Sequence, residues 1–247
     1  DEVLAWESLS KDEKKVCARM QEIFAGFLEH TDEQVGRFVD YLESMNLLEN
    51  TLFVVLSDNG ASDEGGDFGN INIRKHYAFV DEPIEELIAK IDLLGSEYAY
   101  NHYPKGWGFA GNTPLKWFKM DTFGGGIRDP LIMHWPQKIK DHGGIRNQYH
   151  HCVDFVPTVL ELLNITAPTT HNGIEQLPIH GKSMVYAFDD PKVTTQKTTQ
   201  YFEMLGDRGI WHDGWKAVTR HKKGTDFEAD VWELYHVEED FSESKNV

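Results

Sequence analysis

The amino-acid sequence predicts an α/β fold that ends in a smaller antiparallel β section. Apolar residues recur at helical spacing from about residue 16 to residue 45, directly before a strand-like run at residues 53–57. That run is apolar on both faces, which is typical of an interior strand in a mixed, largely parallel sheet. Beyond about residue 164, short runs separated by Pro and Gly indicate antiparallel strands. We therefore expect two parts, residues 1–163 and residues 164–247.

The first helix has a clear start signal. Ser10 is followed three residues later by Glu13, the pattern in which the two side chains cap each other's backbone amides. We expect the helix to continue to about Met45 and to pack on a sheet along one face. A shorter helix is expected at about residues 83–94.

The later elements depend on turn and breaker residues. Pro157 lies inside an apolar helical run, so that helix either begins nearby or is kinked there. The Asp213-Gly214 pair between apolar runs indicates a β-hairpin. Further strands are expected at residues 127–135, with Pro130 at a bulge or an edge, and at residues 231–237.

Composition excludes several classes of protein. The chain of 247 residues has 41 acidic and 24 basic side chains, for a formal net charge of −17. Such a surface repels nucleic acid and anionic lipid, so we expect neither as a partner. No apolar run approaches the roughly 20 residues of a membrane span. Cys17 and Cys152 lie among apolar residues, where we expect buried free thiols rather than a disulfide bridge.

An acid and an amide stand side by side where the first strand should end. Asp58 and Asn59 precede Gly60, and Asp-Asn-Gly is good turn chemistry. The same two side chains offer the hard oxygen ligands that Ca²⁺ and Mg²⁺ prefer. The end of a strand is also where α/β sheets bind ligands. The local sequence favours the turn and leaves the metal site open.

A second candidate segment surrounds Lys119. Three consecutive glycines, residues 124–126, let the backbone pass close to another group, and Lys119 could reach the same cleft. The alternative is a flexible loop with a surface lysine. Tyr103 and Trp107 belong to an aromatic-rich loop that either walls a substrate cleft or is simply pinned by its rings. The acidic loop at residues 63–67 lacks the spacing of a calcium site and is expected to be solvated.

His150, His151 and Cys152 are adjacent, so on a helix they diverge too far to bind one ion. We therefore do not expect this trio to form a metal site.

Several characteristic segments occur together and in order: "WESLSKDEKK", "NTLFVVLSDNGA", "LKWFKMDTFGGGIRDPLIMHWP", "DFVPTVLELLNI", "HGKSM", "GIWHDGWKAV" and "WELYHVEED". With them the chain resembles the sulfatase family, in particular the bacterial arylsulfatase branch of the alkaline-phosphatase-like superfamily. The resemblance implies an α/β sandwich with a large mixed, largely parallel sheet, followed by a small antiparallel β subdomain.

The resemblance also implies the chemistry. Asp58 and Asn59 correspond to calcium ligands, and Lys119 to a lysine that contacts the sulfate of a sulfate monoester. The family's nucleophile is a formylglycine made in a C/S-x-P-x-R segment, which this sequence lacks, because neither Cys17 nor Cys152 stands in that context. We therefore expect a C-terminal half, inactive alone, whose partner is the missing N-terminal half, in the bacterial cytoplasm or periplasm.

Two other functions stay open. A phosphonate or phosphate ester hydrolase of the same superfamily commonly has His after the aspartate, a ligand for zinc or manganese. The amide of Asn59 suits calcium better and so favours a sulfatase. The other alternative is a non-catalytic remnant that binds a partner or a sulfated ligand.

Overall fold

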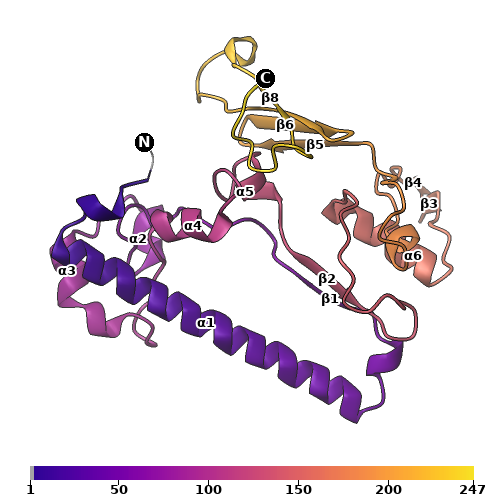
Figure 1. Cartoon of the computed structure of the whole chain (residues 1–247), viewed down its shortest axis with the longest axis horizontal. Coiled ribbons are helices and arrows are strands. Elements are labelled where there is room, and N and C mark those ends of the chain that lie inside the picture. The colour runs from indigo at the N-terminus through magenta and orange to yellow at the C-terminus, as the bar shows by residue number, and fades with distance from the viewer. Residues whose placement is uncertain (1–2) are drawn as a thin grey trace.

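The structure is a computed structural model that describes residues 3–247 (Figure 1). A single long helix, α1, spans one side of the molecule, and short helices gather at its N-terminal end. A four-stranded sheet forms the C-terminal part. The helices are α1 (Lys11–Ser44), α2 (Ile73–Tyr77), α3 (Ile84–Ala89), α4 (Lys105–Asn112), α5 (Gly124–Ile127) and α6 (Phe155–Leu162); the strands are β1 (Phe53–Leu56), β2 (Leu131–His134), β3 (Thr170–His171), β4 (Ile174–Glu175), β5 (Thr199–Met204), β6 (Asp207–His212), β7 (Trp215–Thr219) and β8 (Glu233–His236).

The start of α1 is the predicted capping box. The amide of Glu13 donates to Ser10 Oγ at 3.3 Å, and the amide of Ser10 donates to Glu13 Oε2 at 2.6 Å. The helix ends at Ser44, and Asn46, the residue after the C-cap Met45, adopts a left-handed φ of 55°. The predicted helix at residues 83–94 is also present, as α3 followed by a 3₁₀ turn, Ile91–Leu93.

The buried residues of α1 lie in its N-terminal part, apart from Leu42 near its end. Side chains of the N-terminal part join a hydrophobic cluster with α3 and the neighbouring loops. Farther along, Phe27 and Phe38 are 64% and 51% exposed, so α1 does not bury a continuous apolar face on a sheet within the described residues. There the ring of Phe38 lies 5.8 Å from that of Phe53 in β1. The buried members of the cluster are Val16, Met20, Ile71, Leu87 and Leu94.

The pairing of the first strand differs from the prediction. β1 pairs with β2, and the pairing is antiparallel, with Phe53 opposite His134 and Leu56 opposite Leu131. Among residues 3–247, no parallel strand pairs with β1, so the largely parallel sheet is not present there. An apolar run indicates a strand but does not identify its partner, which explains the error. The residues of β1 are also half-buried or exposed rather than buried on both faces. β2 is also shorter than the predicted strand 127–135, because residues 124–127 form the helical turn α5.

The C-terminal sheet is antiparallel, as predicted. Its strands lie in the order β5-β6-β7-β8. The hairpin between β6 and β7 turns at Asp213 and Gly214, both with positive φ, as expected for this pair. Phe123, Val218 and Tyr235 form a buried cluster that joins this sheet to the segment before α5.

Helix α6 begins at Phe155, so Pro157 falls in its first turn, where its missing N–H costs no hydrogen bond. The side chain of Asp154, just before the helix, is fully buried and accepts hydrogen bonds from His150 and Lys197. Burial alone would raise the pKa of Asp154, but these bonds and two from backbone amides hold it well below its usual value. Both cysteines are free, as predicted.

Cys17 is buried, as expected, but the prediction that Cys152 is buried is wrong. Cys152 lies in a 3₁₀ turn, Cys152–Asp154, ahead of α6, and is exposed there. The neighbouring Val153 is likewise exposed, so this turn presents its apolar residues to the surface.

Candidate functional site

The antiparallel pairing of β1 and β2 continues past the ends of both strands. The amide of Ser57 bonds to the carbonyl of Pro130 at 3.4 Å, and this register places Asp58 across from Asp129. The side-chain nitrogen Nδ2 of Asn59 donates to the carbonyl of Gly60, while Asn59 Oδ1 has no hydrogen-bond partner within residues 3–247. The strand end therefore presents a carboxylate and an amide oxygen at the surface.

Close backbone packing fixes the loop after Asn59. The amide of Gly60 donates to the carbonyl of Gly126 at 3.2 Å. A Cβ at Gly60 would lie 1.6 Å from the carbonyl oxygen of Gly125, so no other residue fits without moving the backbone. The triple glycine thus serves close contact between two loops, one of the two roles that the sequence allowed.

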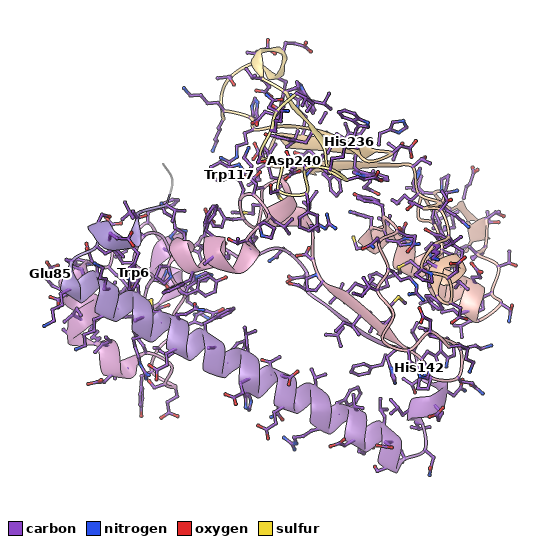
Figure 2. All side chains as sticks on the ribbon, in the orientation of Figure 1. Trp6, Glu85, Trp117, His142, His236 and Asp240 are labelled. Atoms are coloured by element: carbon purple, nitrogen blue, oxygen red, sulfur yellow. The ribbon has the colours of Figure 1, made fainter. Side chains whose placement is uncertain are left out.

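Lys119 is held against this loop. Its backbone amide donates to the carbonyl of Ala61 at 3.0 Å, which brings it to the segment that carries Asp58 and Asn59. Trp117 and Met120, on either side, adopt left-handed φ angles of 66° and 71°. Non-glycine residues in this conformation cost energy and are often found at functional sites. In Figure 2, Trp117 lies where the loop meets the C-terminal sheet.

Asn112, at the end of α4, braces the two loops. Its Oδ1 accepts from the amide of Ala61 at 3.0 Å, and its Nδ2 donates to the carbonyls of Trp117 and Gly125, both at 2.9 Å. One side chain therefore contacts the loop that follows Asp58 and Asn59, the loop that carries Lys119, and the triple glycine. Nothing near Asn112 in the sequence indicates this role, because the contacts span up to 51 residues.

The ammonium of Lys119 is paired with a carboxylate. Lys119 Nζ lies 3.1 Å from Glu64 Oε2, and this hydrogen bond raises the pKa of Lys119, against a smaller effect of burial. Burial alone would raise the pKa of Glu64, but hydrogen bonds from Lys119 and Ser62 hold it below its usual value. The expectation that the acidic loop is simply solvated is therefore wrong for Glu64, whose side chain is only 13% exposed.

Asp58 and Asp129 set the electrostatics of the strand end. Burial and the nearby charge of Asp58 raise the pKa of Asp129 to about 6. Like charges directly opposite each other on paired strands are destabilising, and a cation between them would relieve the repulsion. The oxygen donors fit a hard divalent cation. In residues 3–247, no group of three or more His, Cys, Asp or Glu side chains could hold a metal ion.

The two aromatic candidates have different surroundings. The hydroxyl of Tyr103 accepts from the amide of Ser62 at 3.2 Å, next to Glu64, and its ring packs edge-on against Phe24. Trp107 instead donates from Nε1 to the carbonyl of Cys17 at 2.8 Å. It lines a cavity of about 340 Å³ near the N-terminus of α1 whose lining includes neither Asp58 nor Lys119. A substrate role for either residue stays a prediction.

The structure gives His150 a structural role, through its bond to Asp154. Within the described part of the chain, no helix is long and apolar enough to cross a membrane.

Comparison with known protein families matches two overlapping regions of the chain. Residues 8–165 match Sulfatase, and residues 116–247 match N-sulphoglucosamine sulphohydrolase, C-terminal. The first match contains Asp58, Asn59 and Lys119, and the second contains Lys119 and the C-terminal sheet.

Individual relatives agree with these matches. An uncharacterized sulfatase of Schizosaccharomyces pombe is 30% identical over 246 residues, which cover 98% of this chain and 42% of the relative. An arylsulfatase of Klebsiella aerogenes is 26% identical over 180 residues, 72% of this chain and 37% of the relative. An N-acetylgalactosamine-6-sulfatase of Mus musculus is 26% identical over 202 residues, 79% of this chain and 30% of the relative. The chain thus spans less than half the length of these relatives.

Proposed function

We propose that this chain, which belongs to the sulfatase family, contributes the cation-binding and sulfate-binding residues of a sulfate monoester hydrolase. The observation that carries the proposal is the bond between the amide of Lys119 and the carbonyl of Ala61, 3.0 Å long. It fixes the backbone of Lys119 beside the loop that carries Asp58 and Asn59, and the charge of Asp58 acts on the Lys119 ammonium. Asn59 and Lys119 lie 60 positions apart in the sequence, and only the fold brings their loops together.

The proposed roles follow from charge. Asp58 and Asn59 would hold Ca²⁺ through hard oxygen atoms. The ammonium of Lys119 would contact the sulfuryl oxygens, where negative charge develops as the ester bond breaks. A formylglycine, when present, would supply the nucleophilic oxygen. The chain contains no C/S-x-P-x-R segment, so we propose that this group comes from polypeptide outside these 247 residues and that they do not hydrolyse sulfate esters alone.

Exposed apolar surface supports a polypeptide partner. β1 and β2 form a sheet of only two strands, which is at best marginally stable by itself. Leu56 in β1 and Ile132 in β2 are 49% and 60% exposed. Phe27 and Phe38 on α1 are also exposed. We propose that the remaining part of a sulfatase fold, present in the longer relatives, covers these faces and adds strands beside β1. The largely parallel sheet would then be completed by that partner.

The narrower assignment to the bacterial arylsulfatase branch is supported by the Klebsiella aerogenes relative. The more extensive match to a Schizosaccharomyces pombe sulfatase does not favour that branch over others. Calcium and the natural sulfate ester are part of the same proposal. The amide oxygen of Asn59 favours calcium, and hence sulfate ester over phosphate ester hydrolysis.

The test is the turnover of an aryl sulfate by the protein that includes a C/S-x-P-x-R segment. We expect Lys119→Ala to lower kcat/KM by roughly 10²- to 10³-fold, the effect of removing one group that stabilises the developing charge. Lys223→Ala removes an exposed lysine of the C-terminal part and serves as the matched control. An unchanged kcat/KM for Lys119→Ala contradicts the proposal, as does clear turnover by residues 1–247 alone.

Two further measurements separate the alternative functions. A phosphate ester hydrolase would give a higher kcat/KM for an aryl phosphate than for the aryl sulfate. A non-catalytic remnant would turn over neither ester, even with the additional segment, and its Ca²⁺ affinity in a titration would not change when that segment is present.

A further inference from the structure

Glu64 is a fixed carboxylate at the side chain proposed to bind the substrate. Its Oε2 lies 3.1 Å from Lys119 Nζ and 3.0 Å from Ser62 Oγ. The amide of Glu64 also donates to Ser62 Oγ at 3.1 Å, so backbone and side chain are fixed by the same serine. With 13% of its side chain exposed, Glu64 has little freedom to swing away from Lys119.

The contact has a consequence for any anion that Lys119 binds. An anion in contact with Nζ lies within about 6 Å of the Glu64 carboxylate, because both touch the same nitrogen. Coulomb repulsion between them is proportional to the charge on the anion. A sulfate monoester carries one negative charge, whereas a phosphate monoester carries nearly two at neutral pH. The carboxylate therefore opposes the phosphate ester about twice as strongly.

We propose that Glu64 is a specificity-determining residue that disfavours doubly charged phosphoryl ligands relative to singly charged sulfuryl ligands at Lys119. The inference rests on the proposed function, since it takes Lys119 as the group that meets the transferred sulfuryl group. It adds a reason for the selectivity that does not depend on the metal. The carboxylate weakens anion binding in general, and it weakens the binding of dianions more.

A purely positioning role for Glu64 makes a different prediction. If Glu64 only orients Lys119, its removal weakens the binding of both ligand types by a similar factor. If it selects by charge, its removal tightens the binding of the dianion more than that of the monoanion. The ratio of the two affinities therefore separates the two roles, whatever the absolute affinities are.

The experiment uses two ligands that cannot be hydrolysed. Benzenesulfonate carries one negative charge, and phenylphosphonate carries two above its second pKa. Their dissociation constants for the chain with Ca²⁺ present are measured by NMR titration, for the wild type and for Glu64→Gln. We expect the substitution to improve phenylphosphonate affinity roughly 3- to 10-fold more than benzenesulfonate affinity, from one unit of charge at this separation in a partly hydrated site.

Three further variants make the outcome decisive. Glu22→Gln removes a carboxylate from an exposed ion pair with Arg19 on α1, and we expect it to leave the ratio unchanged. Glu64→Ala repeats the charge removal if the glutamine variant fails to fold, as judged by circular dichroism. Lys119→Ala should weaken the binding of both ligands.

An unchanged affinity ratio in both Glu64 variants overturns the selectivity of Glu64 but leaves the proposed function intact, provided that Lys119→Ala weakens binding. If Lys119→Ala has no effect on either affinity, the anion site itself is wrong, and the selectivity falls with it. If the chain alone binds neither ligand, the same comparison is made on the protein that turns over esters. In the protein that turns over esters, the same substitution should raise the kcat/KM ratio of aryl phosphate to aryl sulfate by a similar factor.

Discussion

Replacing Gly60 by alanine tests whether backbone contact holds the loop after Asn59 against the triple glycine, residues 124–126. Gly60 directly follows Asp58 and Asn59, and its amide bonds to the carbonyl of Gly126. The added methyl carbon would lie 1.6 Å from the carbonyl oxygen of Gly125 and 3.2 Å from Cα of Gly126. All of these atoms belong to the backbone, so no side chain can rotate to make room.

The magnitude follows from the size of the clash. An ordinary carbon–oxygen contact is about 3.4 Å, so the two loops would have to separate by nearly 2 Å. Overpacking of this kind typically costs about 1–3 kcal/mol, and the separation also breaks the hydrogen bond from Gly60. We therefore expect Gly60→Ala to lower the free energy of unfolding by about 3 kcal/mol. In a domain of this size, that corresponds to a fall in Tm of roughly 6–12 °C.

The assay is thermal unfolding followed by circular dichroism, with Gly36→Ala as the matched control. Gly36 lies inside α1, and a Cβ there would have no heavy atom within 4 Å. The control should therefore gain about 0.5–1 kcal/mol from helix propensity. The same glycine-to-alanine change is thus expected to act in opposite directions. A Gly60→Ala protein as stable as the wild type would refute the argument that backbone contact joins the loops.

Three further predictions use other parts of the chain. Asn112→Leu should cost about 2 kcal/mol in urea unfolding, since it leaves three backbone partners without their hydrogen bonds; no loss would mean that the brace is dispensable. Asp154→Asn should cost about 3 kcal/mol near neutral pH, because it leaves the buried Lys197 without its charge partner. The folded pKa of Asp154 is depressed, so its contribution exists above the unfolded value of about 3.9 and fades as the pH falls; a loss that is independent of pH between about 7 and 3 would contradict this. Ellman's reagent should label the exposed Cys152 at once and Cys17 only on unfolding, because burial raises the pKa of the Cys17 thiol to about 11; equal labelling rates would disprove that difference.

Local features were predictable from the sequence because their causes are close along the chain. The capping box depends on Ser10 and Glu13, three residues apart. The hairpin at Asp213-Gly214 depends on two residues that tolerate positive φ. Pro157 marks the start of a helix because its own ring excludes the interior of one. Each of these signals acts within one turn of the chain.

Features that depend on distant residues were not predictable in the same way. The apolar residues of β1 showed that a strand is present, but the antiparallel partner β2 lies about 80 positions later. The sequence around Glu64 predicts a solvated loop, because nothing nearby indicates that Lys119, 55 residues on, pairs with it. The role of Asn112 was missed for the same reason. The resemblance supplied Asp58, Asn59 and Lys119, and the fold supplied the residues that hold the lysine and its loop in place.

The charges at the end of β1 require a divalent cation to bind before an anionic ester does, and this order can be tested. The ammonium of Lys119 is already paired with Glu64 and also feels the charge of Asp58, and Asp58 in turn lies close enough to Asp129 to raise the pKa of that second aspartate. Without a divalent cation, this region therefore repels an anionic ester, and the cation must reverse the local charge before the ester can bind. We expect the affinity for benzenesulfonate to fall at least tenfold when EDTA removes Ca²⁺, since two positive charges nearby are worth more than about 1.4 kcal/mol. Asp129→Asn should reduce that dependence because it removes one of the opposing charges, and the exposed variant Glu22→Gln should not. Equal affinity with and without Ca²⁺ would show that Lys119 recruits the anion unaided.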